Sequence, residues 1–207
     1  MIKLVIFDWD GTIVDSFVFI RSLGRFLIKE FDLNIKQIFS LKKITYMKFS
    51  DLTKLISNLK GIEEEKVFNI LLDAALSRVY KMKYRLNLRH IKSHKENFIM
   101  GIVTNNYKKI PLKKLEETHY NFFDFVIGSN EMKDKKEAIQ MKLKEYDLKP
   151  EECLLIGDSP SDMEYGKRCG VHRVWYPNIF FNNLTVRKHY DHKIKKTDDL
   201  IQLMYGL

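Results

Sequence analysis

The sequence predicts an α/β fold in which a parallel sheet is covered by helices, with a helical segment inserted after the first strand. Leu4 to Phe7 form an apolar run without alternation, which is typical of a strand buried on both faces. Residues 16–83 show helical spacing of their apolar positions and little strand signal. From Phe98 onward, short apolar runs alternate with polar helical segments, and this alternation indicates a parallel sheet.

The composition limits the class of protein. The chain has 207 residues, a net charge of +9 and 45% hydrophobic residues, enough for a core in one or two domains. With only two cysteines, Cys153 and Cys169, no disulfide framework is expected, and a reducing compartment, by default the cytoplasm, is the expected location. No run approaches the roughly 18 apolar residues of a membrane helix, so no membrane partner is expected.

The first predicted strand ends in two carboxylates, Asp8 and Asp10, followed directly by Gly11. In an extended chain, residues two apart project to the same side, about 6 to 7 Å from each other. Gly11 allows the chain to turn sharply there. Because open α/β sheets bind their ligands at the carboxyl edge of the strands, we expect one substrate to meet both acids.

Three interpretations of this segment compete. In the first, Asp8 is a nucleophile toward phosphorus and Asp10 is a general acid and base. In the second, the segment is a calcium loop, and in the third it is a polar turn. A calcium loop of the EF-hand type starting at Asp8 would need glycine at Ile13 and glutamate at Phe19, so that interpretation fails. The rest of the chain has to decide between the other two.

Helical spacing in the inserted segment predicts three helices, over residues 17–31, 51–59 and 63–80. Beyond it, strands are predicted at residues 98–103, 125–128, 153–156 and 171–175, and helices near residues 109–119, 134–146 and 160–169. A last strand at 190–194 and a helix at 197–204 complete the prediction.

Side chains suited to function follow two of the later strands. Thr104 and Asn105 follow one strand, in a turn whose backbone N–H groups can face an anion. Asp158 and Asp162 follow another, after a glycine, and Lys133 lies between the two segments. Singly, each has an ordinary interpretation as a strand-end cap, a first-turn helix acid or a solvated charge. Together they favour a functional site.

In these residues the chain resembles the haloacid dehalogenase superfamily, whose phosphatases carry four motifs in this order. The matching positions are residues 8–12, Thr104, Lys133, and Gly157-Asp158 with Asp162. The family lysine is usually followed by proline, whereas Asp134 follows here, and Lys135 is an alternative for this position. The segment from Phe7 to Ser16 is similar to that of phosphoglycolate phosphatases and their relatives.

The resemblance implies a three-layer Rossmann-like core domain formed by residues 1–15 and 84–207. It implies that residues 16–83 are a helical cap domain of the first (C1) type. It also implies a cytoplasmic Mg²⁺-dependent phosphatase acting on a small phosphorylated metabolite. Asp10 argues against the dehalogenase branch, which lacks this second aspartate.

The expected chemistry assigns a role to each motif. Asp8 attacks phosphorus to form an aspartyl phosphate, and Asp10 protonates the leaving group and then activates water. The implied Mg²⁺ ligands are Asp8, the backbone carbonyl of Asp10, and Asp158, with Asp162 ligating or orienting. The residues expected to bind the phosphoryl oxygens are Thr104, Asn105 and Lys133.

Two other functions are considered. A phosphomutase would use the same site to return the phosphoryl group to a sugar hydroxyl. A non-enzymatic nucleic-acid-binding protein is suggested only by the high isoelectric point, near 9.3. No aromatic and basic recognition motif supports it, and acids at the strand ends would repel a phosphate backbone, so no nucleic-acid partner is expected.

The positive charge is unevenly distributed. Residues 16–96 hold 17 Lys and Arg against 8 Asp and Glu, while the remainder holds 19 against 19. Cations of a closing cap could contact the non-reacting end of an anionic substrate. The candidates are Arg21, Arg25, Lys43 and Lys48. We therefore expect a substrate that carries a second negative group.

Overall fold

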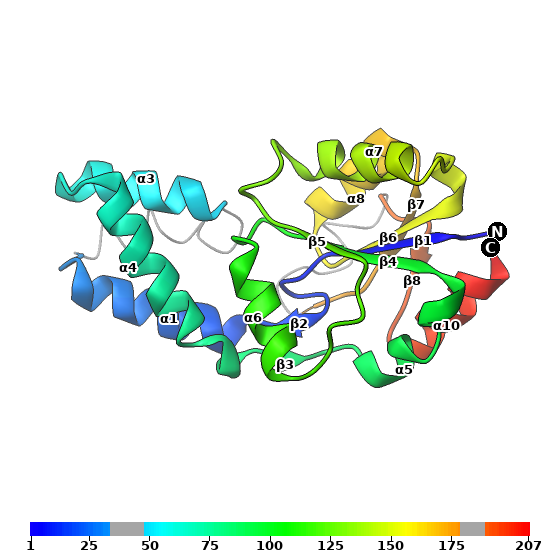
Figure 1. Ribbon diagram of the computed structural model, residues 1–207, viewed down its shortest axis with the longest axis horizontal. Helices are drawn as coiled ribbons and strands as arrows, with labels where there is room; N and C mark the ends of the chain where they lie inside the picture. The colour runs from blue at the N-terminus through cyan, green and yellow to red at the C-terminus, as the bar shows by residue number, and fades with distance from the viewer. Residues whose placement is uncertain (34–47, 179–188) are drawn as a thin grey trace.

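A six-stranded parallel sheet forms the centre of the molecule in the computed structural model, which describes residues 1–33, 48–178 and 189–207 (Figure 1). The strands lie in the order β5-β4-β1-β6-β7-β8. Their bounds are β1 Leu4–Phe7, β4 Ile99–Val103, β5 Phe125–Ile127, β6 Cys153–Gly157, β7 His172–Trp175 and β8 His192–Lys193. The predicted α/β class and parallel sheet are confirmed.

The first strand lies in the middle of this sheet, between β4 and β6. Leu4 and Ile6 pack into the hydrophobic cluster on one face, and Val5 and Phe7 into the cluster on the other. All four side chains are fully buried. Both faces of the strand are covered, which explains why its sequence is apolar without alternation.

Helices cover the two faces of the sheet and complete three layers (Figure 1). On one face lie α7 (Lys135–Glu145) and α8 (Pro160–Cys169). On the other lie α5 (Leu88–Lys92), α6 (Lys109–Glu117) and α10 (Thr197–Gly206). The short helix α5 was not predicted, because one turn of helix shows too little periodicity.

The inserted segment forms α1 (Phe17–Glu30), α3 (Phe49–Lys60) and α4 (Glu64–Leu76), which lie together to one side of the sheet (Figure 1). The three predicted helices are therefore present. The last of them ends at Leu76 rather than Tyr80 and is followed by a 3₁₀ turn, Val79–Lys81. The side chains of Ser77 and Arg78 both bond to the carbonyl of Ala74, in the last turn of the helix.

A two-stranded antiparallel sheet joins the two connections between the helical part and the core. Its strands are β2 (Val14–Asp15), on the outgoing chain, and β3 (Lys83–Tyr84), on the returning chain. Strands of two residues carry no detectable alternation, so this pair was not predicted. It lies at the predicted boundaries of the helical insert, and the division into domains remains a prediction.

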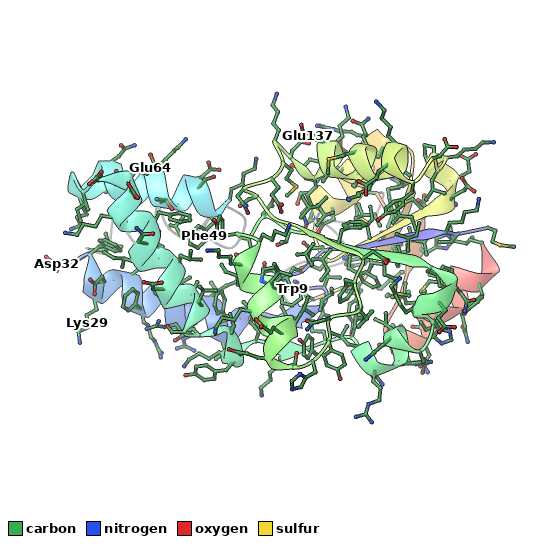
Figure 2. All side chains as sticks on the ribbon, in the orientation of Figure 1. Trp9, Lys29, Asp32, Phe49, Glu64 and Glu137 are labelled. Carbon is green, nitrogen blue, oxygen red and sulfur yellow. The ribbon has the colours of Figure 1, made fainter. Side chains whose placement is uncertain are left out.

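Phe49 lies where the helical part meets the core (Figure 2). Its ring packs against those of Phe68 and Tyr107, with centroids 5.7 and 5.9 Å away, and its backbone N–H donates to the carbonyl of Asn105 at 3.4 Å. The two cysteines are buried and unpaired. Within the described ranges, no helix has the length and hydrophobicity needed to cross a membrane.

Candidate active site

The register of the sheet brings three of the predicted residues to one edge. Phe7 of β1 pairs with Ile102 of β4 on one side and with Ile156 of β6 on the other, so the three strands end at nearly the same level. Asp8, Thr104 and Asp158 follow these strands directly and are all buried. The carboxyl edge of the central strands is therefore the candidate site.

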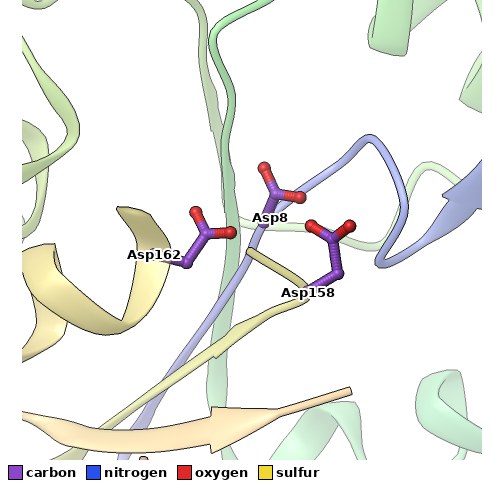
Figure 3. A group of neighbouring side chains, drawn as sticks. All are labelled: Asp8, Asp158 and Asp162. Carbon is purple, nitrogen blue, oxygen red and sulfur yellow. The ribbon is translucent and has the colours of Figure 1, made fainter. Parts of the chain in front are cut away.

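Three carboxylates meet at this edge, from three different elements (Figure 3). Asp8 follows β1, Asp158 follows β6, and Asp162 lies in the first turn of α8. Their exposed fractions are 5%, 5% and 1%, and one oxygen from each lies within 4.8 Å of the others. Such a set of buried oxygen ligands suits a hard divalent cation.

The position of Asp162 follows from the start of α8. Ser159 is the N-cap of this helix, and Asp162 is the third helical residue. Asp162 Oδ2 accepts hydrogen bonds from the backbone N–H of Ser159 at 3.2 Å and from its hydroxyl at 2.5 Å. This capping box engages Oδ2, and Oδ1 faces the site, where it accepts a hydrogen bond from Lys135.

The lysine that lies at this cluster is Lys135, whereas the sequence favoured Lys133 and left Lys135 as the alternative. Lys135 is 4% exposed, and its ammonium donates to Asp8 Oδ1 at 2.5 Å and to Asp162 Oδ1 at 2.6 Å. Lys133 is exposed and does not line the site, and its carbonyl accepts a hydrogen bond from Lys48. The geometry thus favours the alternative that the sequence left open.

The start of α7 explains this difference. Asp134 is the N-cap, and its side chain accepts from the backbone N–H of Glu137 at 2.9 Å, so Lys135 is the first helical residue and points inward. The pattern Asp134-x-x-Glu137 is a helix-start signal that is readable in the sequence. It would have separated Lys135, inside the helix, from Lys133, outside it.

Asp10 lies beside the cluster and is held by a residue that was not predicted. The side-chain amide of Asn106 donates to Asp10 Oδ2, and the backbone N–H of Asn106 is held by the Thr104 hydroxyl at 3.0 Å. Gly11 has a φ of 80°, and a side chain there would collide with the carboxylate of Asp158. Glycine is therefore required both for the turn and for the close approach.

Burial raises the pKa values of the acids in the site. It raises the pKa of Asp8 to about 7, opposed by Lys135, and that of Asp10 to about 6, opposed by hydrogen bonds from Ser16 and Asn106. Burial together with Asp8 and Asp162 holds the pKa of Asp158 well above its usual range. Burial lowers the pKa of Lys135, but Asp162 and Asp8 more than offset this and raise it. Negative charge here is thus only partly compensated, which fits the binding of a cation.

The site opens into a cavity of about 240 Å³. The predicted residues that line it are Asp8, Asp10, Thr104, Asn105, Asp158 and Asp162. Lys135, Arg85 and Asn178 also line it, and sequence reasoning assigned no role to the last two. No motif marks Arg85 or Asn178, because their positions depend on how distant segments meet.

The predicted cations of the helical part do not line this cavity. Arg21 and Arg25 lie exposed on α1, and Lys48 donates to the carbonyl of Lys133 instead. Lys43 lies outside the described residues. The helical part, residues 16–83, contributes Ser16, Phe17 and Ile20 to the lining, and the two side chains from α1, Phe17 and Ile20, are apolar.

The core is thus a three-layer α/β fold with buried aspartates at the carboxyl edge of its two central strands, β1 and β6. Residues 5–176 match the family described as haloacid dehalogenase-like hydrolase, and the chain belongs to this family. The predicted superfamily is thereby confirmed.

Curated relatives cover most of the chain. A phosphoglycolate phosphatase of Aquifex aeolicus is 26% identical over 178 residues, which cover 82% of each chain. A pyrophosphatase of Oceanobacillus iheyensis is 25% identical and covers 98% of this chain and 97% of its own. A haloacid dehalogenase-like hydrolase from Streptococcus pneumoniae superposes with a TM-score of 0.76 at 19% identity over 98% of both chains, and this likeness shows the fold.

Proposed function

We propose that this protein is a Mg²⁺-dependent phosphatase that hydrolyses a small phosphate monoester through an aspartyl-phosphate intermediate. The observation that carries the proposal is the buried cluster of Asp8, Asp158 and Asp162, in which Asp8 and Asp162 accept hydrogen bonds from the ammonium of Lys135. The curated relatives named as phosphatase and pyrophosphatase support the reaction class.

In the first step, a carboxylate oxygen of Asp8 attacks phosphorus and the ester P–O bond breaks. Asp10 donates its proton to the leaving oxygen; its pKa, raised to about 6, keeps a protonated fraction near neutral pH. In the second step, Asp10 takes a proton from water, which attacks the phosphorus of the aspartyl phosphate. Inorganic phosphate leaves and the Asp8 carboxylate is regenerated.

The other residues bind and orient. Thr104 and Asn105 follow the end of β4 and line the same cavity, and they are suited to hold phosphoryl oxygens. Lys135 keeps Asp8 in place and balances its charge. Asp8, Asp158 and the carbonyl of Asp10 would hold Mg²⁺, with Asp162 orienting or ligating. When bound, the cation neutralises the carboxylates and the phosphoryl group.

The helical part, residues 16–83, acts in this proposal as a cap over the core formed by residues 1–15 and 84–207. Phe17 and Ile20 of α1 line the cavity, which supports a role in excluding water from the reaction. The paired strands β2 and β3 are the two connections across which such a cap would move.

The proposed substrate carries a second anionic group. Two relatives are named after phosphoglycolate and pyrophosphate, and both of these compounds carry a second anionic group. Arg21, Arg25 and Lys48 do not line the cavity, so another cation has to contact this group.

The test is release of inorganic phosphate from a panel of phosphoesters with Mg²⁺ or with EDTA. We expect turnover with Mg²⁺ and loss of turnover with EDTA. A phosphomutase would share the first half-reaction, but would convert a sugar phosphate into its isomer with little phosphate release. Full activity in EDTA would contradict the proposal.

A further inference from the structure

Arg85 lies at the wall of the cavity, in the segment that returns from the helical part. It directly follows β3, and its backbone N–H donates to the carbonyl of Ile13, on the outgoing chain, at 2.9 Å. The side chain is half-buried. The backbone of Arg85 is therefore fixed by its hydrogen bond to the outgoing chain, next to the paired strands β2 and β3.

The guanidinium group of Arg85 is held in one orientation. Nη1 donates to the carbonyl of Gly11, Nη2 donates to the carbonyl of Pro177 at 2.6 Å, and the group lies 4.1 Å from the centroid of the Tyr176 ring. The hydroxyl of Tyr176 in turn donates to the carbonyl of Arg85 at 3.3 Å. An arginine fixed in this way loses little further freedom when it binds a ligand.

The charge of Arg85 has no close anionic partner among the residues that the structure describes. Toward these residues the guanidinium uses two of its five N–H donors, both bonded to neutral carbonyls. Across the described ranges, no carboxylate lies within 4.0 Å of its guanidinium, although Asp158 is close enough for Arg85 to lower its pKa. A half-buried cation at a cavity wall without an ion pair is suited to meet an anion of the ligand.

The other cation of the cavity has a different role. Lys135 is bound to Asp8 and Asp162, while the helical part contributes the apolar side chains of Phe17 and Ile20. Among the described lining residues, Arg85 is thus the cation that is not paired with an acid of the site. An anion bound away from the phosphoryl position would find its favourable charge there.

We propose that Arg85 is the specificity-determining residue that binds the second anionic group, a carboxylate or a second phosphate, of the substrate. This inference rests on the proposed phosphatase function. The planar guanidinium matches the two oxygens of such a group, and its carbonyl contacts hold it ready for binding. It takes the role that the sequence suggested for Arg21 and Lys48.

The test rests on two esters that differ only in the distal group: phosphoglycolate and ethyl phosphate have a carboxylate and a methyl group at the same position. Pyrophosphate, an anhydride that carries a second phosphate, is the third substrate. We would measure kcat/KM for the three with saturating Mg²⁺ at low salt, for wild type, Arg85→Gln, Arg85→Lys and Arg89→Gln. Arg89 is exposed on α5 and serves as a matched control for loss of one positive charge.

The wild type should prefer phosphoglycolate or pyrophosphate over ethyl phosphate. Arg85→Gln should reduce this ratio by about tenfold or more, the usual effect of losing a hydrogen bond to a charged group. Arg85→Lys should retain part of the preference, because the charge stays, and Arg89→Gln should leave the ratio unchanged. Thermal unfolding of each variant shows whether it is folded.

An equal loss on all three substrates in Arg85→Gln would assign Arg85 a purely structural role and overturn the inference. Equal efficiency of the wild type on all three would also overturn it, while the proposed phosphatase function would stand. Hydrolysis of none of the three by a protein that releases phosphate from other members of the panel would overturn the inference alone. Release of phosphate from no member of the panel would contradict the proposed function itself, and the inference would fall with it.

Discussion

At the scale of single residues, the buried ammonium of Lys135 connects Asp8 of the first strand to Asp162 of α8. Removing it would leave two buried acids without their partner, which is more costly than losing an exposed ion pair. Lys133, two residues earlier, is exposed outside the helix. Substitution of the two lysines should therefore have different effects on activity, although both lysines fit the sequence motif.

Lys135→Met should lower kcat/KM by about a hundredfold or more, because a preorganised charge in the site is lost. Lys133→Met should stay within about twofold of wild type, as is usual for exposed positions. Steady-state kinetics on the best substrate of the panel checks both. A larger effect at Lys133 than at Lys135 would contradict the geometry.

Asp8→Asn should reduce turnover to less than about a hundredth of wild type, because an amide cannot form the acyl phosphate. The amide is nearly isosteric, so the far-ultraviolet circular dichroism should be unchanged. Rapid-quench labelling with a ³²P-phosphoester should detect a phosphorylated wild-type protein and none in the variant. Activity above a tenth of wild type would rule out Asp8 as the nucleophile.

At the scale of elements, the edge strand β8 is short and is supported by an ion pair next to it. Arg173 of β7 donates to Asp191 from Nε at 3.0 Å and from Nη2 at 2.6 Å, and its backbone N–H donates at 2.8 Å. These bonds hold the pKa of Asp191 below its usual range. They stabilise the fold only while Asp191 is ionised.

Asp191→Asn should therefore lower the free energy of unfolding at pH 7 by about 0.5 to 1 kcal/mol, the range for a partly exposed pair. The stabilisation is present above the unfolded pKa of about 3.9 and is lost as the pH falls through the lower folded pKa. Urea titrations at pH 7 and pH 3 should thus show a difference that is smaller at pH 3. Glu164→Gln, which breaks the exposed pair with Arg168 inside α8, is the control and should have a smaller effect.

At the scale of the whole molecule, the acids that form the site oppose folding when no cation is bound. The pKa of Asp158 is raised in the folded protein by burial, Asp8 and Asp162, so the folded state retains a proton that the unfolded state releases. Stability must then fall as the pH rises from about 4 toward the raised value. A bound cation removes this penalty.

In EDTA, the melting temperature should accordingly be lower at pH 8 than at pH 5.5, and Mg²⁺ should raise it more at pH 8. Asp158→Asn should melt higher than wild type in EDTA at pH 8, because a buried charge is gone, and should respond less to Mg²⁺. Differential scanning calorimetry measures all four conditions. A melting temperature independent of Mg²⁺ at both pH values would contradict a cation site at this cluster.

The sequence by itself determined the parallel sheet, the three inserted helices and the places of Asp8, Thr104 and Asp158. These features are local: an apolar run specifies a buried strand, and the residue that ends it must lie at the edge of the sheet. The capping pattern at Ser159 likewise specifies where Asp162 lies.

Only the tertiary structure decided which cations face the site. Arg21 and Arg25 share a helix with cavity-lining Ile20, but lie exposed on it. Lys135 lies in the site because α7 packs on one face of the central sheet, where its ammonium reaches Asp8. Arg85 lies there because the returning chain pairs with the outgoing one, as in the pair of Val14 and Tyr84, which are 70 residues apart. Such placement depends on contacts between segments distant in the chain, and no local pattern of charges encodes it.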